Sequence, residues 1–232
     1  MTTSEPELGP VAALRAGWRL VGRDPVGILV PAGAILLLQA VVWLDLRAGV
    51  GARSATEAGL RFIVGWAMVA VMSAPLRVAM LQAGARCIPR RGLGLRRTAA
   101  LAGAQLLVAG AQGVWIAASL VVLGLVSGGA LAYGWWSIAS LGGALVLVGS
   151  ALGYLALQVL VAWVPVEVVL GGRSGLGAVG ASLTRGRLST SAAAVVGGGL
   201  ATGLGGLLCG AGALPGYPIR DLALLCAYEG GP

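Results

Sequence analysis

The chain has 232 residues, of which 58% are hydrophobic and only 10% are charged, and its mean hydropathy is +0.92. This composition excludes an ordinary soluble domain and predicts an all-α fold, a polytopic membrane helix bundle with about six transmembrane helices. The net charge of +8 comes from arginines that lie between apolar stretches, and this excludes the solvated basic face of a nucleic-acid-binding domain.

Residues 1–24 are expected to form a polar tail followed by a short amphipathic helix at the membrane surface. The tail lacks the basic segment and short apolar core of a cleaved signal peptide, so the first span should remain as an anchor. Residues 11–23 have helical periodicity, with arginines at 15, 19 and 23 beside an apolar face. That face consists of Val11, Leu14, Trp18 and Val21. Asp24-Pro25 is expected to end this helix.

Residues 25–232 are expected to form one transmembrane bundle. Apolar runs predict spans at about 25–46, 59–82, 99–126, 138–170 and 191–212. Pro165 should kink the fourth span near its end. The segment 214–218, LPGYP, predicts a turn. The last run, 219–228, is short and should cross incompletely or dip into the bundle.

The arginines predict the orientation, because cytoplasmic loops of membrane proteins carry the excess of basic residues. With six spans and the N-terminus inside, cytoplasmic segments carry eleven arginines: residues 15, 19, 23, 86, 90, 91, 96, 97, 173, 185 and 187. Outer segments carry three, at residues 47, 53 and 61. Both termini are therefore expected in the cytoplasm.

Glycine pairs four residues apart predict close helix packing. These pairs are Gly149 and Gly153 in the fourth span, and Gly199 with Gly203 and Gly206 with Gly210 in the fifth. The fourth and fifth spans are therefore expected to pack tightly.

Charged residues inside apolar spans are costly and mark functional candidates. Arg77 and Glu167 both lie near the predicted cytoplasmic ends of their spans, so an ion pair between the second and fourth spans is one hypothesis. The alternative is that Arg77 extends to the headgroups while Glu167 lies at the interface. Asp45 and Arg220 form a second candidate pair near the outer face. Asp221 is the best isolated candidate for an intramembrane carboxylate.

Two further sets of polar residues have a structural and a functional interpretation. The loop after the second span carries a basic cluster that predicts binding of anionic lipid headgroups: Arg86, Arg90, Arg91, Arg96 and Arg97. The glutamines within spans are predicted to bond between helices rather than to line a substrate path: Gln39, Gln105, Gln112 and Gln158.

The chain offers little for catalysis. Histidine is absent, which removes the commonest general base and zinc ligand, and the three cysteines have no metal-ligand spacing. Gly175, Gly177 and Gly180 match a dinucleotide fingerprint, but the preceding run is a predicted membrane helix rather than a strand. We therefore expect no enzyme activity, no cofactor and no catalytic or metal site.

Three segments carry a family resemblance: GWRLVGRDPVGILVPA, APLRVAMLQAGAR and VPVEVVLGGRSGLGAVGASLTRGR. Together they resemble bacterial multipass proteins of the glycerophosphoryl diester phosphodiesterase membrane-domain type and their relatives of unknown function. The resemblance implies an amphipathic arm, about six spans and an interfacial segment after the fourth. That segment would contain Ala178, Ser182, Leu183, Arg185, Gly186 and Arg187. Phosphodiesterase activity in such proteins would belong to a separate soluble domain.

The resulting expectation is a non-enzymatic protein of the bacterial inner membrane. It would act as an accessory or scaffold subunit that binds membrane lipids, membrane-protein partners or a second copy of itself, and no nucleic acid. The alternative is a permease subunit, since exporter-type ABC permeases also begin with an amphipathic arm and an RDP-like step. The basic loop ARCIPRRGLGLRR departs from that resemblance. A continuous polar cavity would favour the permease alternative.

Overall fold

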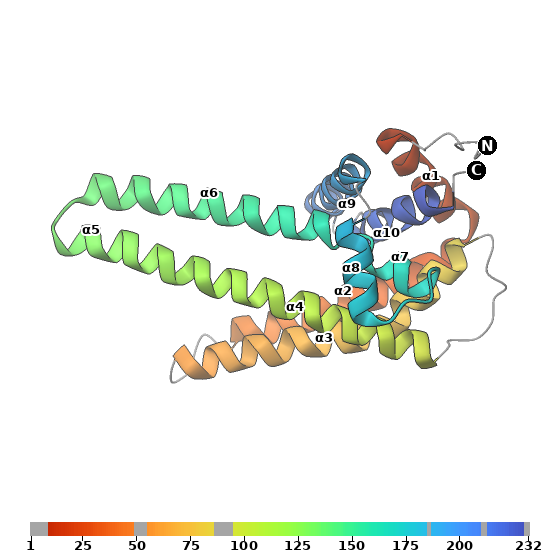
Figure 1. Ribbon diagram of the computed structural model, residues 1–232, viewed down its shortest axis with the longest axis horizontal. Helices are drawn as coiled ribbons and strands as arrows, with labels where there is room; N and C mark the ends of the chain where they lie inside the picture. Colours follow the sequence, from red (N-terminus) through yellow and green to blue (C-terminus); the bar gives the residue numbers. More distant parts are fainter. Residues whose placement is uncertain (1–8, 49–54, 86–94, 185–186, 210–212, 230–232) are drawn as a thin grey trace.

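The computed structural model describes residues 9–48, 55–85, 95–184, 187–209 and 213–229, and within these ranges the regular secondary structure is all helical (Figure 1). Four helical stretches are long and apolar enough to cross a membrane: Pro25–Val42, Ile63–Gly84, Leu95–Ala132 and Trp136–Val169. Each exceeds or approaches the roughly 20 residues that a hydrocarbon core requires. The expected all-helical fold is confirmed, and four of its helical stretches have the length and apolarity of membrane spans.

The first helix, α1 (Pro10–Arg23), ends where the sequence indicates. Asp24 leaves helical geometry, and α2 (Pro25–Ala48) begins at the proline. The Asp24 carboxylate accepts a hydrogen bond from the backbone N–H of Gly27 at 3.0 Å, which caps α2.

Helix α1 packs against the rest of the protein mainly through small residues. Its buried residues are Ala13, Ala16, Gly17, Leu20 and Val21. Val11 and Trp18, which belong to the apolar face expected at the membrane surface, are exposed. Small residues are buried because α1 approaches α10 closely: a Cβ at Gly17 would lie 3.0 Å from the backbone nitrogen of Ala223.

Two helical hairpins give the molecule its elongated shape. The first consists of α2 and α3 (Ala55–Gly84). In the second, α4 (Leu95–Leu123) continues through a π-helical segment (Gly124–Gly128) and α5 (Gly129–Ala132) before α6 (Trp136–Leu160) returns. Figure 1 shows the second hairpin projecting well beyond the first. Its outer surface is apolar and exposed, with Leu120, Val121, Leu141 and Leu145 among its exposed side chains.

The returning arm is interrupted near Pro165, as its sequence predicts. Helix α6 ends at Leu160, a turn follows, and α7 (Val164–Val169) begins with the proline in its first turn. Proline is tolerated there because the first N–H groups of a helix have no acceptor within the helix. Every residue of α7 is buried. Helix α8 (Gly175–Thr184) buries Ala178, Ala181 and Ser182 and leaves Leu176 and Leu183 exposed.

The core of the protein surrounds α10 (Ala213–Tyr228), which packs mainly against α9 (Leu188–Cys209) and α1. Residues 218 and 219 and 221–227 are all buried. The turn predicted at 214–218 is wrong, because these residues form the first turns of α10. Pro215 lies in the first turn, where no helical hydrogen bond is lost, and Pro218 is accommodated inside the helix. The expectation that this segment dips into the bundle agrees with its burial.

The predicted tight packing of the fourth and fifth spans through paired glycines is wrong for the described residues. A Cβ at Gly149, Gly199 or Gly203 would meet nothing within 4 Å. Gly153 instead faces the ring of Trp115 on α4. The closest approach of α9 is to α10, where a Cβ at Gly216 would lie 2.6 Å from the backbone of Ala201. Gly206 and Gly210 lie outside the residues whose contacts are described.

Candidate functional site

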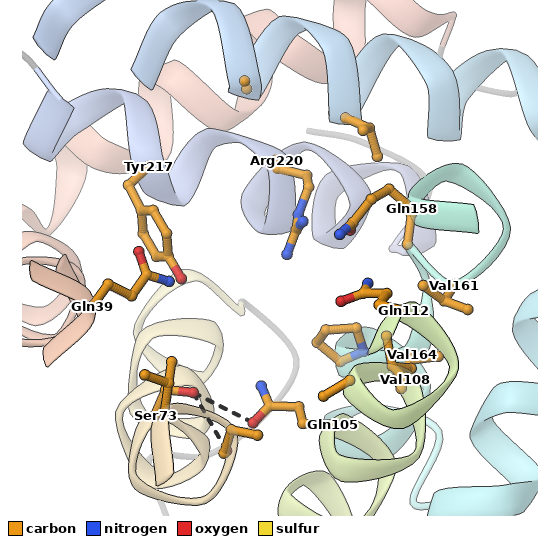
Figure 2. Close-up of a pocket in the computed structure, with 18 of the residues that line it drawn as sticks. Gln39, Ser73, Gln105, Val108, Gln112, Gln158, Val161, Val164, Tyr217 and Arg220 are labelled. Atoms are coloured by element: carbon orange, nitrogen blue, oxygen red, sulfur yellow. Dashed lines mark hydrogen bonds between the residues drawn. The ribbon is translucent and has the colours of Figure 1, made fainter. Parts of the chain in front are cut away.

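A cavity of about 630 Å³ lies between α2, α3, α4, α6, α7, α9 and α10. Ten of its lining residues are polar: Gln39, Ser73, Arg77, Gln105, Gln112, Tyr154, Gln158, Thr202, Tyr217 and Arg220. Figure 2 shows Arg220 and Gln158 pointing into this space from one side and Ser73 and Gln105 lying on the opposite side. Polar groups from separate helices therefore converge on one volume.

Helical spacing explains how these side chains reach the cavity. On α3, Ser73 and Arg77 are one turn apart, and on α4, Gln105 and Gln112 are two turns apart, so each pair shares a helix face. On α10, Tyr217 and Arg220 are separated by three residues and also lie on one face. The two hairpins and α10 thus each contribute a polar stripe to the same space.

A buried ion-pair network lies at the side of the cavity. Asp221 accepts from Arg220 Nε at 3.0 Å through Oδ1, and its Oδ2 lies 3.0 Å from Arg77 Nε. The Asp221 side chain is only 3% exposed, whereas that of Arg220 is 25% exposed. One carboxylate therefore serves two guanidinium groups, which leaves the network with one excess positive charge.

This network differs from the two predicted ion pairs. Arg77 lies against Asp221, and Glu167 of α7 is paired with Arg173 at 3.3 Å. Asp45 is exposed on α2, while Arg220 binds its neighbour Asp221. The reason is the position of α10, which lies inside the bundle and brings Asp221 to Arg77 on α3.

Hydrogen bonds link the cavity wall to Arg77. Ser73 Oγ donates to Gln105 Oε1 at 3.4 Å. The alternative orientation of the Gln105 amide replaces this bond: the oxygen then accepts from Arg77 Nη1 at 2.9 Å and the nitrogen donates to the Ala70 carbonyl, which satisfies both amide groups. On the other side, Gln158 Nε2 donates to the Tyr154 hydroxyl at 3.0 Å. These bonds fix the orientation of the polar side chains.

The four glutamines that were predicted to bond between helices all line the cavity. Among the hydrogen bonds described for these glutamines, only that of Gln105 joins two helices. Gln158 bonds to Tyr154 on its own helix. Tyr217 and Ser73 were missed by the sequence analysis. Residues 217, 220 and 221 are spaced so that they share one face of a helix, and this spacing could have identified Tyr217. It was missed because residues 214–218 were predicted to form a turn.

The predicted headgroup-binding cluster is only partly described. Arg86, Arg90 and Arg91 lie outside the described residues. Arg96 and Arg97 are in the first turn of α4, where Arg96 is exposed and Arg97 is half-buried. Neither lines the cavity.

No protein-family model, curated protein or solved structure matches this chain. The arrangement of its own residues is therefore the basis for a functional proposal. A search of the described residues finds no group of three or more Cys, Asp or Glu side chains that could hold a metal ion.

Proposed function

We propose that the chain is a non-enzymatic integral membrane protein that holds a small ligand in the cavity between its helices, as an accessory subunit of the bacterial inner membrane. The observation that carries this proposal is the convergence of ten polar side chains on one cavity of about 630 Å³. Polar groups at membrane depth are costly unless they bind one another, water or a ligand. Pockets of several hundred Å³ are the size that small ligands occupy.

The membrane arrangement we propose has about six inserted helices, with α9 and α10 added to the four long ones, and both termini in the cytoplasm. Its support is the distribution of arginines. Arg173 and Arg187 flank α8, which Figure 1 places at the same end of the molecule as α1. Arg61, on the first turns of α3, lies toward the opposite end with α5. This asymmetry fits a cytoplasmic end around α1 and α8. Helix α1 would then lie along the surface with Trp18 in the headgroup region.

A permease subunit is the second candidate, because the same polar cavity lies between helices of two different hairpins. Transport would require the hairpins to move apart in turn toward either side of the membrane. Ligand binding without transport distinguishes the accessory subunit from the permease.

The test of the proposed function is to fill the cavity. Gly199 lines it, and a Cβ there would meet nothing within 4 Å, so Gly199→Phe should occupy the space without displacing the backbone. Wild-type protein purified in mild detergent should retain a small molecule or lipid that native mass spectrometry detects. We expect Gly199→Phe to lose it.

The matched control is Gly149→Phe on α6, which also has open space around its Cβ position but does not line the cavity. This variant should keep the bound molecule. The proposal is wrong if the wild-type protein and the control retain no ligand. It is also wrong if Gly199→Phe retains the same ligand as they do.

A further inference from the structure

The charged side chains that line the cavity are all positive. Its charged lining residues are Arg77 and Arg220, and no Asp or Glu side chain of the described chain lines it. Asp221 pairs with both arginines but is not part of the lining. Since one carboxylate balances only one guanidinium, a ligand that reaches this part of the cavity meets an excess positive charge.

Donors for an anion lie around this charge. Figure 2 shows the guanidinium of Arg220 extending into the open space, with the amide of Gln158 beside it. Arg77, which also lines the cavity, is held by its ion pair with Asp221 at 3.0 Å from Nε to Oδ2, and it adds its positive charge to the site. Guanidinium and amide N–H groups are the donors that recognise phosphate and carboxylate oxygens.

The rest of the cavity is apolar. Leu36, Val69, Val108, Leu155, Val161 and Val195 line it. An ion with a complete hydration shell would leave these side chains facing water at a cost in free energy. A ligand with an apolar portion would cover them.

The cavity also reaches the molecular surface between α6 and α9. Leu155, Gly199 and Gly203 line it and are exposed. The surface beside this opening is apolar, since Leu152 and Leu200 are 61% and 58% exposed. In the membrane arrangement proposed above, this opening faces lipid rather than water, so a molecule dissolved in the bilayer has direct access.

From these observations we propose that the ligand of the cavity is an anionic amphiphile, a lipid-like molecule with one negatively charged phosphate or carboxylate group. This inference rests on the proposed function and specifies its ligand class. The anionic group binds Arg220 beside Gln158, where Arg77 adds positive charge, and the acyl chain leaves between α6 and α9. A free anion would supply the charge but not the apolar contacts.

The experiment measures lipid affinity by native mass spectrometry of delipidated protein in mild detergent. Phosphatidylglycerol carries one negative charge, and phosphatidylcholine is its zwitterionic counterpart. We expect one phosphatidylglycerol to bind about tenfold or more tightly than phosphatidylcholine, because the quaternary ammonium of phosphatidylcholine brings a positive charge to a site that already has an excess of one. Gly199→Phe should abolish this binding.

Arg220→Gln should weaken phosphatidylglycerol binding about tenfold or more and phosphatidylcholine binding less, so that the preference for phosphatidylglycerol is lost. Arg220→Lys keeps the charge and should retain most of the preference, which separates a charge effect from a folding defect. Arg61→Gln is the control, because Arg61 is 45% exposed and is paired with Glu57 away from the cavity. It should bind both lipids like the wild type.

The outcomes separate this inference from the proposed function. If both lipids bind equally and Gly199→Phe still excludes them, the anionic specificity is wrong and the proposed function stands. If glycerophosphoglycerol or inorganic phosphate displaces phosphatidylglycerol at comparable concentration, the apolar part of the site is wrong and the ligand is a free anion. If Gly199→Phe changes no binding, the proposed function itself is wrong.

Discussion

The α4–α6 hairpin is very apolar but exposed, whereas α10 carries charged residues but is buried. The two arms of the hairpin have a mean hydropathy of 2.1 each, yet only 6% and 0% of their most apolar segments are buried. Helix α10 contains two prolines, Arg220 and Asp221, yet residues 221–227 are all buried. In a soluble protein this order would be reversed. The comparison shows that the most apolar surface here is suited to face lipid, while the core also encloses charged side chains.

The two short helices follow the same rule. Helix α1 exposes Val11 and Trp18 and buries alanines and a glycine, and α8 exposes Leu176 and Leu183 while it buries Ala178. Close helix contact requires small side chains when hydrocarbon surrounds the protein. Large apolar side chains on these helices can face outward without the penalty that water would impose.

The largest effect should come from removing the carboxylate of α10. Asp221→Asn leaves the guanidinium groups of Arg77 and Arg220 without their counter-charge, and we expect the free energy of unfolding to fall by about 3–5 kcal/mol. Denaturant unfolding in mixed micelles measures it. The control is Glu57→Gln in the exposed Arg61–Glu57 pair, whose loss should cost about 0–1 kcal/mol. Equal effects of the two substitutions would contradict a special role for α10.

Matched leucine truncations compare the two regions directly. Leu222 on α10 is 0% exposed and Leu141 on α6 is 65% exposed. Leu222→Ala should lower the free energy of unfolding by about 2–5 kcal/mol because it leaves a cavity. Leu141→Ala leaves none and should change it by about 0.5 kcal/mol or less. A cost at Leu141 similar to that at Leu222 would show that the hairpin is covered by another protein surface.

The smallest expected difference in the free energy of unfolding is between two glycine substitutions, one on α10 and one on α6. Gly216→Ala would place a methyl group 2.6 Å from backbone atoms of α9, so α9 and α10 must separate, at a cost of about 1–3 kcal/mol. Gly149→Ala meets nothing and should leave stability unchanged or raise it by up to about 1 kcal/mol. The same unfolding titration measures both. A neutral Gly216→Ala would mean that the two helices are not closely packed there.

Hydropathy and proline placement were sufficient to predict much of the fold. The long helices follow from apolar runs, and the breaks at Asp24-Pro25 and near Pro165 follow from the constraints of the proline ring. The buried faces of α1 and α8 could not be obtained in this way. Periodicity identifies an apolar stripe, but whether this stripe faces protein or lipid depends on the surroundings of the helix.

The candidate site was predictable in its charged residues but not in their pairing. Arg77, Arg220 and Asp221 were identified because charge within an apolar segment is costly. Their partners depend on where α10 enters the bundle, and the segment 214–218 was interpreted as a turn. The glutamines at 39, 105, 112 and 158 were also identified individually. That they share one cavity results from the packing of α2, α3, α4 and α6, on which the sequence is silent.

The central position of α10 also constrains the order in which the protein is made. Helix α10 contacts α1, α2, α3, α7 and α9, all of which leave the ribosome before it. Between Arg77 and Asp221 lie about 140 residues, so at about 5–20 residues per second Arg77 waits roughly 7–30 s for its carboxylate. During this interval the guanidinium must be hydrated, bound to lipid phosphates or held by the insertion machinery. Assembly of the earlier helices is therefore completed only when α10 has been synthesised.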